Sequence, residues 1–292
     1  MTQATNPRRL GNRRGALAMS AAMTLLIIND TMTKLASETL PPSQTIAIRG
    51  IFCTLWVLLA VLATGHARYL PQALERRTLI RAALDVAGTI SYLYALFQLP
   101  LAEATTINMA APLLMVMLAV VYLREAVHWQ RWLAVIIGFA GVLLVVRPGG
   151  ANFTWWAVLC LGATALNAAR DVYTRTIASR VPSLIITITG CAVTALITVA
   201  ITTVQGWQPV SAHEYALLIS AAFVLAFAYY LMIVAMRHGE VSVVGAFRYS
   251  GLPAAALLGW LVWGHVPDAL TFAGMAILVA AGFYILNQGR RA

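Results

Sequence analysis

The sequence reads NDTMTK at residues 29–34 and RDVYTR at residues 170–175, so that two similar acidic segments stand 141 positions apart. Three further pairs keep the same separation, namely Pro41 with Pro182, Pro112 with Pro253, and Gly141 with Gly282. Several landmarks at one offset indicate an internal repeat. We therefore predict that the chain consists of two related units, residues 1–146 and residues 151–292.

The composition indicates a protein embedded in lipid. The chain has 292 residues, of which 61% are hydrophobic and 10% are charged. A soluble domain contains roughly 45–50% apolar and 25% charged residues, and no soluble fold of this size could bury such an excess. The apolar residues form long continuous runs, which suit membrane-spanning helices of roughly 20 residues rather than the short alternating strands of a barrel.

Ten apolar runs follow one another with short connections between them. They lie near residues 15–36, 45–64, 81–98, 102–123, 132–146, 155–176, 184–204, 215–236, 241–263 and 269–287. Each unit of the repeat contains five runs, an odd number, so the second unit would enter the membrane in the opposite direction. We therefore expect an all-α polytopic membrane protein with ten transmembrane helices arranged as two inverted five-helix repeats. Such repeats are typical of alternating-access carriers; the alternative is an old duplication without a role in transport.

The distribution of charge predicts the orientation in the membrane. The formal net charge is +10, and most arginines lie in the stretches that are cytoplasmic if the N-terminus is inside. The opposite ends of the helices carry only Lys34, Arg49 and Arg147 as basic residues. This bias predicts that both termini are cytoplasmic. The basic residues show no interleaving with aromatic ones, so we do not expect nucleic acid as a partner.

Several short motifs resemble the EamA branch of the drug/metabolite transporter superfamily. They are PLAEATT at 100–106, APL at 111–113, LRE at 123–125 and GFAGV at 138–142, with Lys34 and Arg49 in positions that this family often uses. The resemblance covers essentially the whole chain as two tandem units. It implies a bacterial inner-membrane protein that exports or exchanges metabolites, with a central cavity lined by helices 1, 3, 4, 6, 8 and 9. Within the branch, the chain is most similar to exporters of aromatic and other amino acids.

The second unit departs from this pattern at two positions. Thr189-Gly190 stands where a counterpart of Arg49 would be, and Gly264-His265 stands where a counterpart of Glu125 would be. Roles that the resemblance assigns to Arg49 and Glu125 are therefore not transferred to the second unit.

Polar residues in the apolar runs point to a binding cavity, because polar groups are costly in lipid and turn inward. Several runs carry them at helical spacing, whereas the fifth and tenth runs carry glycines instead and suit a packed scaffold. The substrate-binding residues that we predict are Tyr92, Asn108, Asn167, Tyr230, Arg248, Tyr249 and Asp85. The simpler alternative for each is a hydrogen bond between neighbouring helices. Pro112 and Pro253 predict kinks in the fourth and ninth runs.

Two acid–base pairs are predicted at the ends of helices. Asp30 precedes Lys34 by four residues, and Asp171 precedes Arg175 by four, which is a favourable spacing for an ion pair on a helix. One interpretation is a structural pair that anchors a helix end. The other is a gate at each mouth of the cavity, made and broken alternately.

The sequence contains none of the motifs of a hydrolase, a nucleotide-binding loop or a metal site. We expect no cofactor and no metal, and we consider a membrane-embedded enzyme or a channel the weaker alternatives. The predicted cavity offers aromatic rings, amides, hydroxyls and few charges. We therefore expect a small-molecule metabolite of zwitterionic or aromatic character, most simply an amino acid, with nucleoside-like or flavin-like metabolites as the alternative. The protein would act in the lipid bilayer as a monomer or homodimer.

Overall fold

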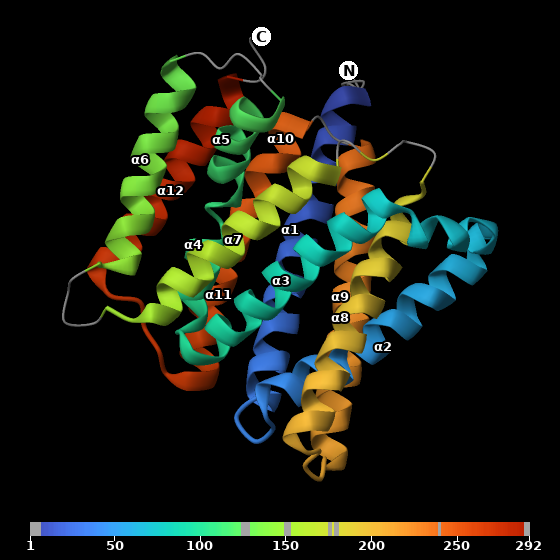
Figure 1. Ribbon diagram of the computed structural model, residues 1–292. Coiled ribbons are helices and arrows are strands. Elements are labelled where there is room, and N and C mark those ends of the chain that lie inside the picture. Colours follow the sequence, from blue (N-terminus) through green and yellow to red (C-terminus); the bar gives the residue numbers. More distant parts are fainter. Residues whose placement is uncertain are drawn as a thin grey trace, which may run out of the picture.

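The computed structural model describes residues 7–123, 129–148, 153–174, 177, 181–238 and 241–288, and this part of the chain is helical throughout its regular elements (Figure 1). The first half contains α1 (Pro7–Ala36), α2 (Pro42–Ala63), η1 (His66–Leu74), α3 (Arg76–Gln98), α4 (Leu101–Asn108), α5 (Ala111–Leu123) and α6 (Trp129–Val146). The second half contains α7 (Trp155–Thr174), α8 (Ser183–Gln205), α9 (Ala212–His238), α10 (Val241–Ala246), η2 (Phe247–Ser250), α11 (Gly251–Trp263) and α12 (Ala269–Gln288).

Six helical segments in the described residues are long and apolar enough to cross a membrane. They are Gly11–Ala36, Pro42–Ala63, Arg76–Gln98, Leu101–Tyr122, Ser183–Gln205 and Ala212–Met232, with shorter apolar helices at Trp132–Val146 and Ala269–Tyr284. The chain is therefore an all-helical, multi-pass protein. The count of ten spans stays a prediction, because α7 includes charged residues and α11 has only 13 residues.

The fourth and ninth expected helices are both interrupted just before their prolines. α4 ends at Asn108 and α5 begins at Ala111, so Pro112 lies in the first turn of α5. In the second half, the 3₁₀ turn η2 separates α10 from α11, and Pro253 lies in the first turn of α11. Proline lacks the N–H that would continue a helix but is tolerated in a first turn. The predicted kinks are confirmed as breaks at corresponding positions of the two halves.

The packing of helices repeats when the two halves are exchanged. A shift of 141 residues places α1 on α7, α2 on α8 and α3 on α9. The extensive contact of α1 with α9 then corresponds to that of α7 with α3, and the contact of α2 with α9 corresponds to that of α8 with α3. Two related units would produce this exchange, and all these contacts join one half to the other. The boundaries at residues 146 and 151 stay a prediction.

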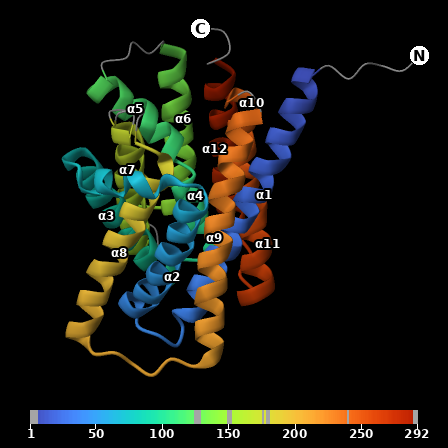
Figure 2. The ribbon, with the colours of Figure 1, turned by 90° about the vertical axis from the view of Figure 1, so that its right-hand side faces the viewer.

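The helices α6 and α12 pack closely at one side of the molecule (Figure 1). A Cβ atom added to Gly141 would lie 2.8 Å from the carbonyl oxygen of Gly274, and one added to Gly274 would lie 2.6 Å from that of Gly141. The two backbones are therefore in direct contact, as expected of glycine at a helix crossing. The first described turns of α1 and the last turns of α12 lie at the same end of the molecule (Figure 2).

Candidate functional site

The first polar group is built around Asp30, in the last third of the helical segment Gly11–Ala36. The Tyr92 hydroxyl on α3 donates a hydrogen bond of 2.9 Å to Asp30 Oδ2, and Asn29 Nδ2 donates one of 3.0 Å to Asp30 Oδ1. Arg49 Nη1 on α2 donates a longer bond of 3.4 Å to Asn29 Oδ1. We call Asn29, Asp30, Arg49 and Tyr92 the Asp30 group. It joins three helices of the first half.

Unused hydrogen-bonding capacity lies around this group. In the described part of the chain, Arg49 Nε, Thr105 Oγ1 and Asn167 Oδ1 are buried without a hydrogen-bond partner. Thr105 lies close to the Tyr92 hydroxyl, and Asn167 Oδ1 lies only 2.4 Å from where a Cβ atom on Gly88 would be. Buried polar atoms normally have partners. A water or a bound molecule could supply partners for these atoms.

Lys34 does not pair with Asp30, and the predicted ion pair is wrong. Among the described residues, no ion pair joins these two side chains; the Lys34 ammonium instead donates to the carbonyl oxygens of Leu96 (2.8 Å) and Leu99. It also lies 5.5 Å from the centre of the Trp263 ring. The carbonyls at the end of a helix attract a cation, so Lys34 ties the end of α1 to the end of α3.

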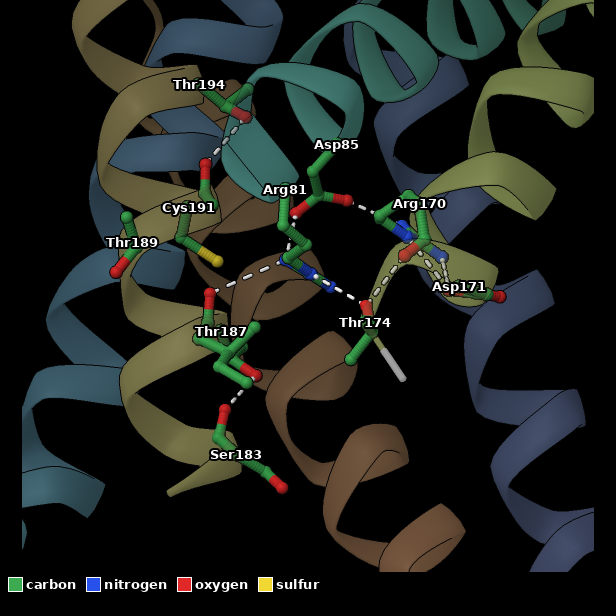
Figure 3. A network of polar contacts seen from close by, with 12 residues as sticks. Arg81, Asp85, Arg170, Asp171, Thr174, Ser183, Thr187, Thr189, Cys191 and Thr194 are labelled. Carbon is green, nitrogen blue, oxygen red and sulfur yellow. Dashed lines mark hydrogen bonds and ion pairs between the residues drawn. The ribbon is translucent and has the colours of Figure 1, made fainter. Parts of the chain in front are cut away.

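The second polar group contains two acids and two bases (Figure 3). Asp85 on α3 accepts from Arg81 Nη1 at 3.0 Å through one oxygen and from Arg170 Nη1 at 2.5 Å through the other. Arg170 Nη2 also contacts Asp171 Oδ1 at 2.8 Å. We call Arg81, Asp85, Arg170 and Asp171 the Asp85 group. Its formal charges cancel, which makes the burial of four ionised side chains tolerable.

The predicted pair of Asp171 with Arg175 cannot be compared with this arrangement, because Arg175 lies outside the described residues. Asp171 contacts Arg170, its neighbour in sequence, and Arg170 also bridges to α3. Asp85 was predicted to bind substrate, and the structure occupies both of its oxygens with arginines. The Asp85 group therefore connects α3 to α7 across the two halves.

Gly190 explains why the second half lacks a counterpart of Arg49. A Cβ atom at Gly190 would lie 2.2 Å from Asp85 Oδ2 and 3.2 Å from Arg81 Nη1, so the space that a side chain would need is filled. In the second half the guanidinium comes from Arg170 on α7, at the position that corresponds to Asn29. The two halves thus place their cation on different helices.

Two further predicted residues lie at the helix breaks. Asn108 is the last residue of α4, and Tyr249, its counterpart by the repeat, lies in η2. The Tyr249 hydroxyl is buried against Gly282 of α12, and its ring stacks 6.4 Å from that of Phe283. Tyr249 is therefore turned toward the scaffold. Arg248 is half-buried, and within the described part of the chain no hydrogen bond or ion pair engages its side chain.

Tyr230 belongs to neither of the two buried polar groups, and its role in binding stays a prediction. Its side chain is 59% exposed and stacks on Phe227, with ring centres 6.2 Å apart. Fully buried residues of α9, such as Ala228, lie on the opposite face of that helix. The neighbouring Tyr229 instead has Arg170 and Asp85 among its electrostatic neighbours. Tyr229, which is itself 41% exposed, thus lies closer to the Asp85 group than Tyr230 does.

At the end of the molecule with the α1–α2 connection, polar contacts join the two halves. Gln44 exchanges two hydrogen bonds with the backbone of Gln208, of 2.8 and 2.9 Å, and Ser43 Oγ donates one of 2.6 Å to Gln205. The hydroxyl of Thr39 also donates to Glu214. We call these contacts the polar seal.

A further ion pair between the halves joins Arg147, after α6, to Asp268, before α12. The Arg147 guanidinium, with the backbone and hydroxyl of Thr271, holds the pKa of the Asp268 carboxyl far below its usual value. These two residues contribute to the rim of a pocket of 330 Å³ that also includes Glu103 and His265. This pocket is separate from both buried polar groups.

Comparison with known proteins identifies the kind of protein to which this architecture belongs. The model of the EamA-like transporter family matches twice, at residues 13–147 and 154–287. The chain is 27% identical over 266 residues to the pseudopaline exporter CntI of Pseudomonas aeruginosa, covering 91% of this chain and 93% of that protein. It is 25% identical over 264 residues to an S-adenosylmethionine uptake transporter of Rickettsia prowazekii, covering 90% and 89%.

A riboflavin transporter of Vibrio cholerae is 28% identical over 280 residues, covering 93% of this chain and 92% of that protein. A crystal structure superposes with a TM-score of 0.63 at 22% identity, covering 98% of this chain and 100% of that chain, a likeness that concerns the fold alone. The repeated family match confirms that the chain consists of two copies of one unit.

Proposed function

The chain belongs to the EamA-like transporter family, and from this we propose that it carries small zwitterionic or aromatic metabolites, amino acids being the simplest case, across the bacterial inner membrane. The two halves alternate around a site between them. Both chain ends face the cytoplasm, and the substrate leaves the cell or is exchanged.

The observation that carries this proposal is the set of buried polar groups where the halves meet. Carriers with inverted repeats bind their substrates near the membrane midplane, between the repeats. The Asp30 group lies in the first half, and the Asp85 group joins α3 to α7 of the second half. Arg49 Nε of the Asp30 group, Thr105 Oγ1 near Tyr92 and Asn167 Oδ1 against Gly88 of α3 are buried and have no hydrogen-bond partner in the described residues. A substrate with hydrogen-bonding groups would satisfy them.

The chemistry of these residues favours a substrate with both signs of charge. Asp30 could accept an ammonium group, and Arg49 or Arg248, neither of which forms an ion pair in the described residues, could accept a carboxylate. Tyr92 and Tyr229 add aromatic surface. A flavin-like or nucleoside-like metabolite is the second candidate, and the similarity to the riboflavin transporter of Vibrio cholerae favours it.

Counterflow in proteoliposomes tests the proposal. Vesicles are loaded with an unlabelled compound and the entry of its radiolabelled form is followed, using phenylalanine, S-adenosylmethionine and riboflavin as probes. We expect rapid exchange of phenylalanine that protein-free vesicles do not show. Exchange of riboflavin alone would favour the second candidate, and exchange of none of a broader metabolite panel would contradict a carrier function.

A further inference from the structure

Asp30 differs from its counterpart in the repeat by the charge of its partners. Asp171 contacts the guanidinium of Arg170 at 2.8 Å. The corresponding neighbour of Asp30 is Asn29, a neutral amide that donates a bond of 3.0 Å, and the second donor is the neutral hydroxyl of Tyr92. Within the described part of the chain, no ion pair includes Asp30. One carboxyl is neutralised by the protein and the other is not.

The ionisable groups around Asp30 come from three helices. Arg49 of α2 acts on it through the Asn29 amide, Tyr92 of α3 bonds to it directly, and the thiol of Cys160 on α7 lies nearby. Lys34, one turn further along α1, is directed away to carbonyls at the end of α3. In the described part of α9 and α11, which also pack against α1, no charged group is among its main electrostatic neighbours.

This arrangement is suited to binding a proton. A carboxylate in a membrane interior is costly unless it is paired, and it avoids that cost by taking up a proton. The side chain is not completely buried, and in the proposed cycle water would reach it when the two halves open around it. The two neutral donors fix the carboxyl in position without fixing its charge.

We propose that Asp30 is the proton-binding site of the transport cycle, holding a proton in one half of the cycle and the cationic group of the substrate in the other. This inference rests on the proposed carrier function. The carboxylate takes its proton from hydronium in the open cavity, leaving water. When an ammonium group arrives, the carboxyl returns the proton to cavity water and pairs with the ammonium instead. Substrate and proton then exclude each other, which couples their opposite movements.

The coupling has a definite limit. With one proton exchanged for each substrate molecule and the membrane potential held at zero, a gradient of one pH unit can support at most about a tenfold concentration ratio of substrate. An accumulation of this order is readily measured in vesicles.

The first experiment needs no substrate. Infrared difference spectra between neutral and mildly acidic pH are recorded on the full-length protein in lipid, where a newly protonated carboxyl gives a carbonyl band. We expect the band in the wild type and in Glu103→Gln, a matched loss of a half-buried acid elsewhere, and its absence in Asp30→Asn. Asp30→Glu should restore it at a shifted frequency. A band that persists unchanged in Asp30→Asn and Asp30→Glu, or is absent from the wild type, would overturn the inference.

The second experiment measures transport under an imposed pH gradient at zero potential, with radiolabelled phenylalanine, S-adenosylmethionine and riboflavin as probes. We expect gradient-driven accumulation by the wild type and by Glu103→Gln, but not by Asp30→Asn. If the wild type exchanges a probe at a rate and to an extent that do not depend on the pH gradient, proton coupling is overturned while the carrier function stands. Absence of exchange for every probe would instead count against the proposed function, and the infrared result would decide the inference alone.

Discussion

Substitution of Gly190 by alanine tests the account of the Asp85 group. The added Cβ atom would lie 2.2 Å from Asp85 Oδ2, well inside contact distance, so the carboxylate must move. Asp85 is held through both oxygens, by Arg81 at 3.0 Å and by Arg170 at 2.5 Å, and its side chain is only 17% exposed. Movement therefore costs one charge-assisted hydrogen bond as well as overpacking.

The expected magnitude follows from these two contributions. Overpacking a filled site typically costs about 1–3 kcal/mol, and a hydrogen bond to a charged group contributes about 1.5–3 kcal/mol. Because the carboxylate can keep one arginine, only one such bond is counted, and we expect a total loss of roughly 2.5–6 kcal/mol for Gly190→Ala. The assay is thermal unfolding of the detergent-solubilised protein, followed by the fraction that remains monodisperse after heating.

Gly162→Ala provides the matched control. Gly162 lies in a helix as Gly190 does, but nothing is within 4 Å of a Cβ atom placed there. Alanine in place of an exposed helical glycine should stabilise by roughly 0.5–1 kcal/mol. We therefore expect the melting temperature to fall by several degrees for Gly190→Ala and to stay level or rise for Gly162→Ala. Equal melting temperatures of the two variants would refute the packing of Asp85 against Gly190.

Two further results are expected from other side chains. Arg248→Ala should lower counterflow of phenylalanine and leave thermal stability close to that of the wild type, because no hydrogen bond or ion pair of its side chain is lost in the described residues. Arg170→Ala should chiefly lower stability, because Asp171 loses its arginine and Asp85 keeps only Arg81. Normal counterflow by Arg248→Ala would remove Arg248 from the site. Cys53 and Cys191 have sulfur atoms 3.4 Å apart on α2 and α8, so a copper–phenanthroline oxidant should join them in a disulfide that mass spectrometry detects and Cys53→Ser abolishes. Failure to cross-link would contradict the packing of α2 on α8.

The features that sequence predicted well are local ones. The breaks before Pro112 and Pro253 depend on a missing N–H, and the close packing of the glycine-containing fifth and tenth runs depends on a missing side chain. Each is a property of a residue and its near neighbours along the chain. Such properties can therefore be predicted without knowing which helices pack around the residue.

The errors concern contacts between helices. Spacing along one helix favoured an ion pair of Asp30 with Lys34. The Lys34 ammonium instead bonds to carbonyl oxygens at the end of α3, and the sequence of α1 contains no signal of that contact. Arg170 was read only as part of the repeated segment, because its partner Asp85 is 85 positions earlier in the chain. The helix α9 is apolar on most sides, so its inward face could not be read, and a step of one residue rotates a side chain by about 100°. That rotation separates Tyr229 from Tyr230.

The two ends of the molecule are closed by different chemistry although the backbone repeats. At the polar seal, Ser43 and Gln44 bond to the second half. Their counterparts by the repeat are Leu184 and Ile185, which pack with Val61 in an apolar cluster at the other end. Opening the polar seal exchanges protein hydrogen bonds for bonds to water, at about 1 kcal/mol each. Opening the apolar end exposes hydrocarbon, at about 25 cal/mol per Å², and also separates Ile186 of this cluster from Arg81, which donates to its carbonyl oxygen at 3.5 Å.

Under the alternating-access proposal, the repeat supplies two related conformations and these side chains make their energies unequal. Replacing a protein hydrogen bond by a bond to water changes the free energy little, whereas exposing hydrocarbon to water is costly. Opening the apolar end therefore costs more free energy per residue than opening the polar seal. Binding of a substrate or a proton at Asp30 would then have to offset that difference before the apolar end could open. Because the two ends differ in the free energy needed to open them, a carrier of two similar halves would favour the conformation in which the apolar end stays closed.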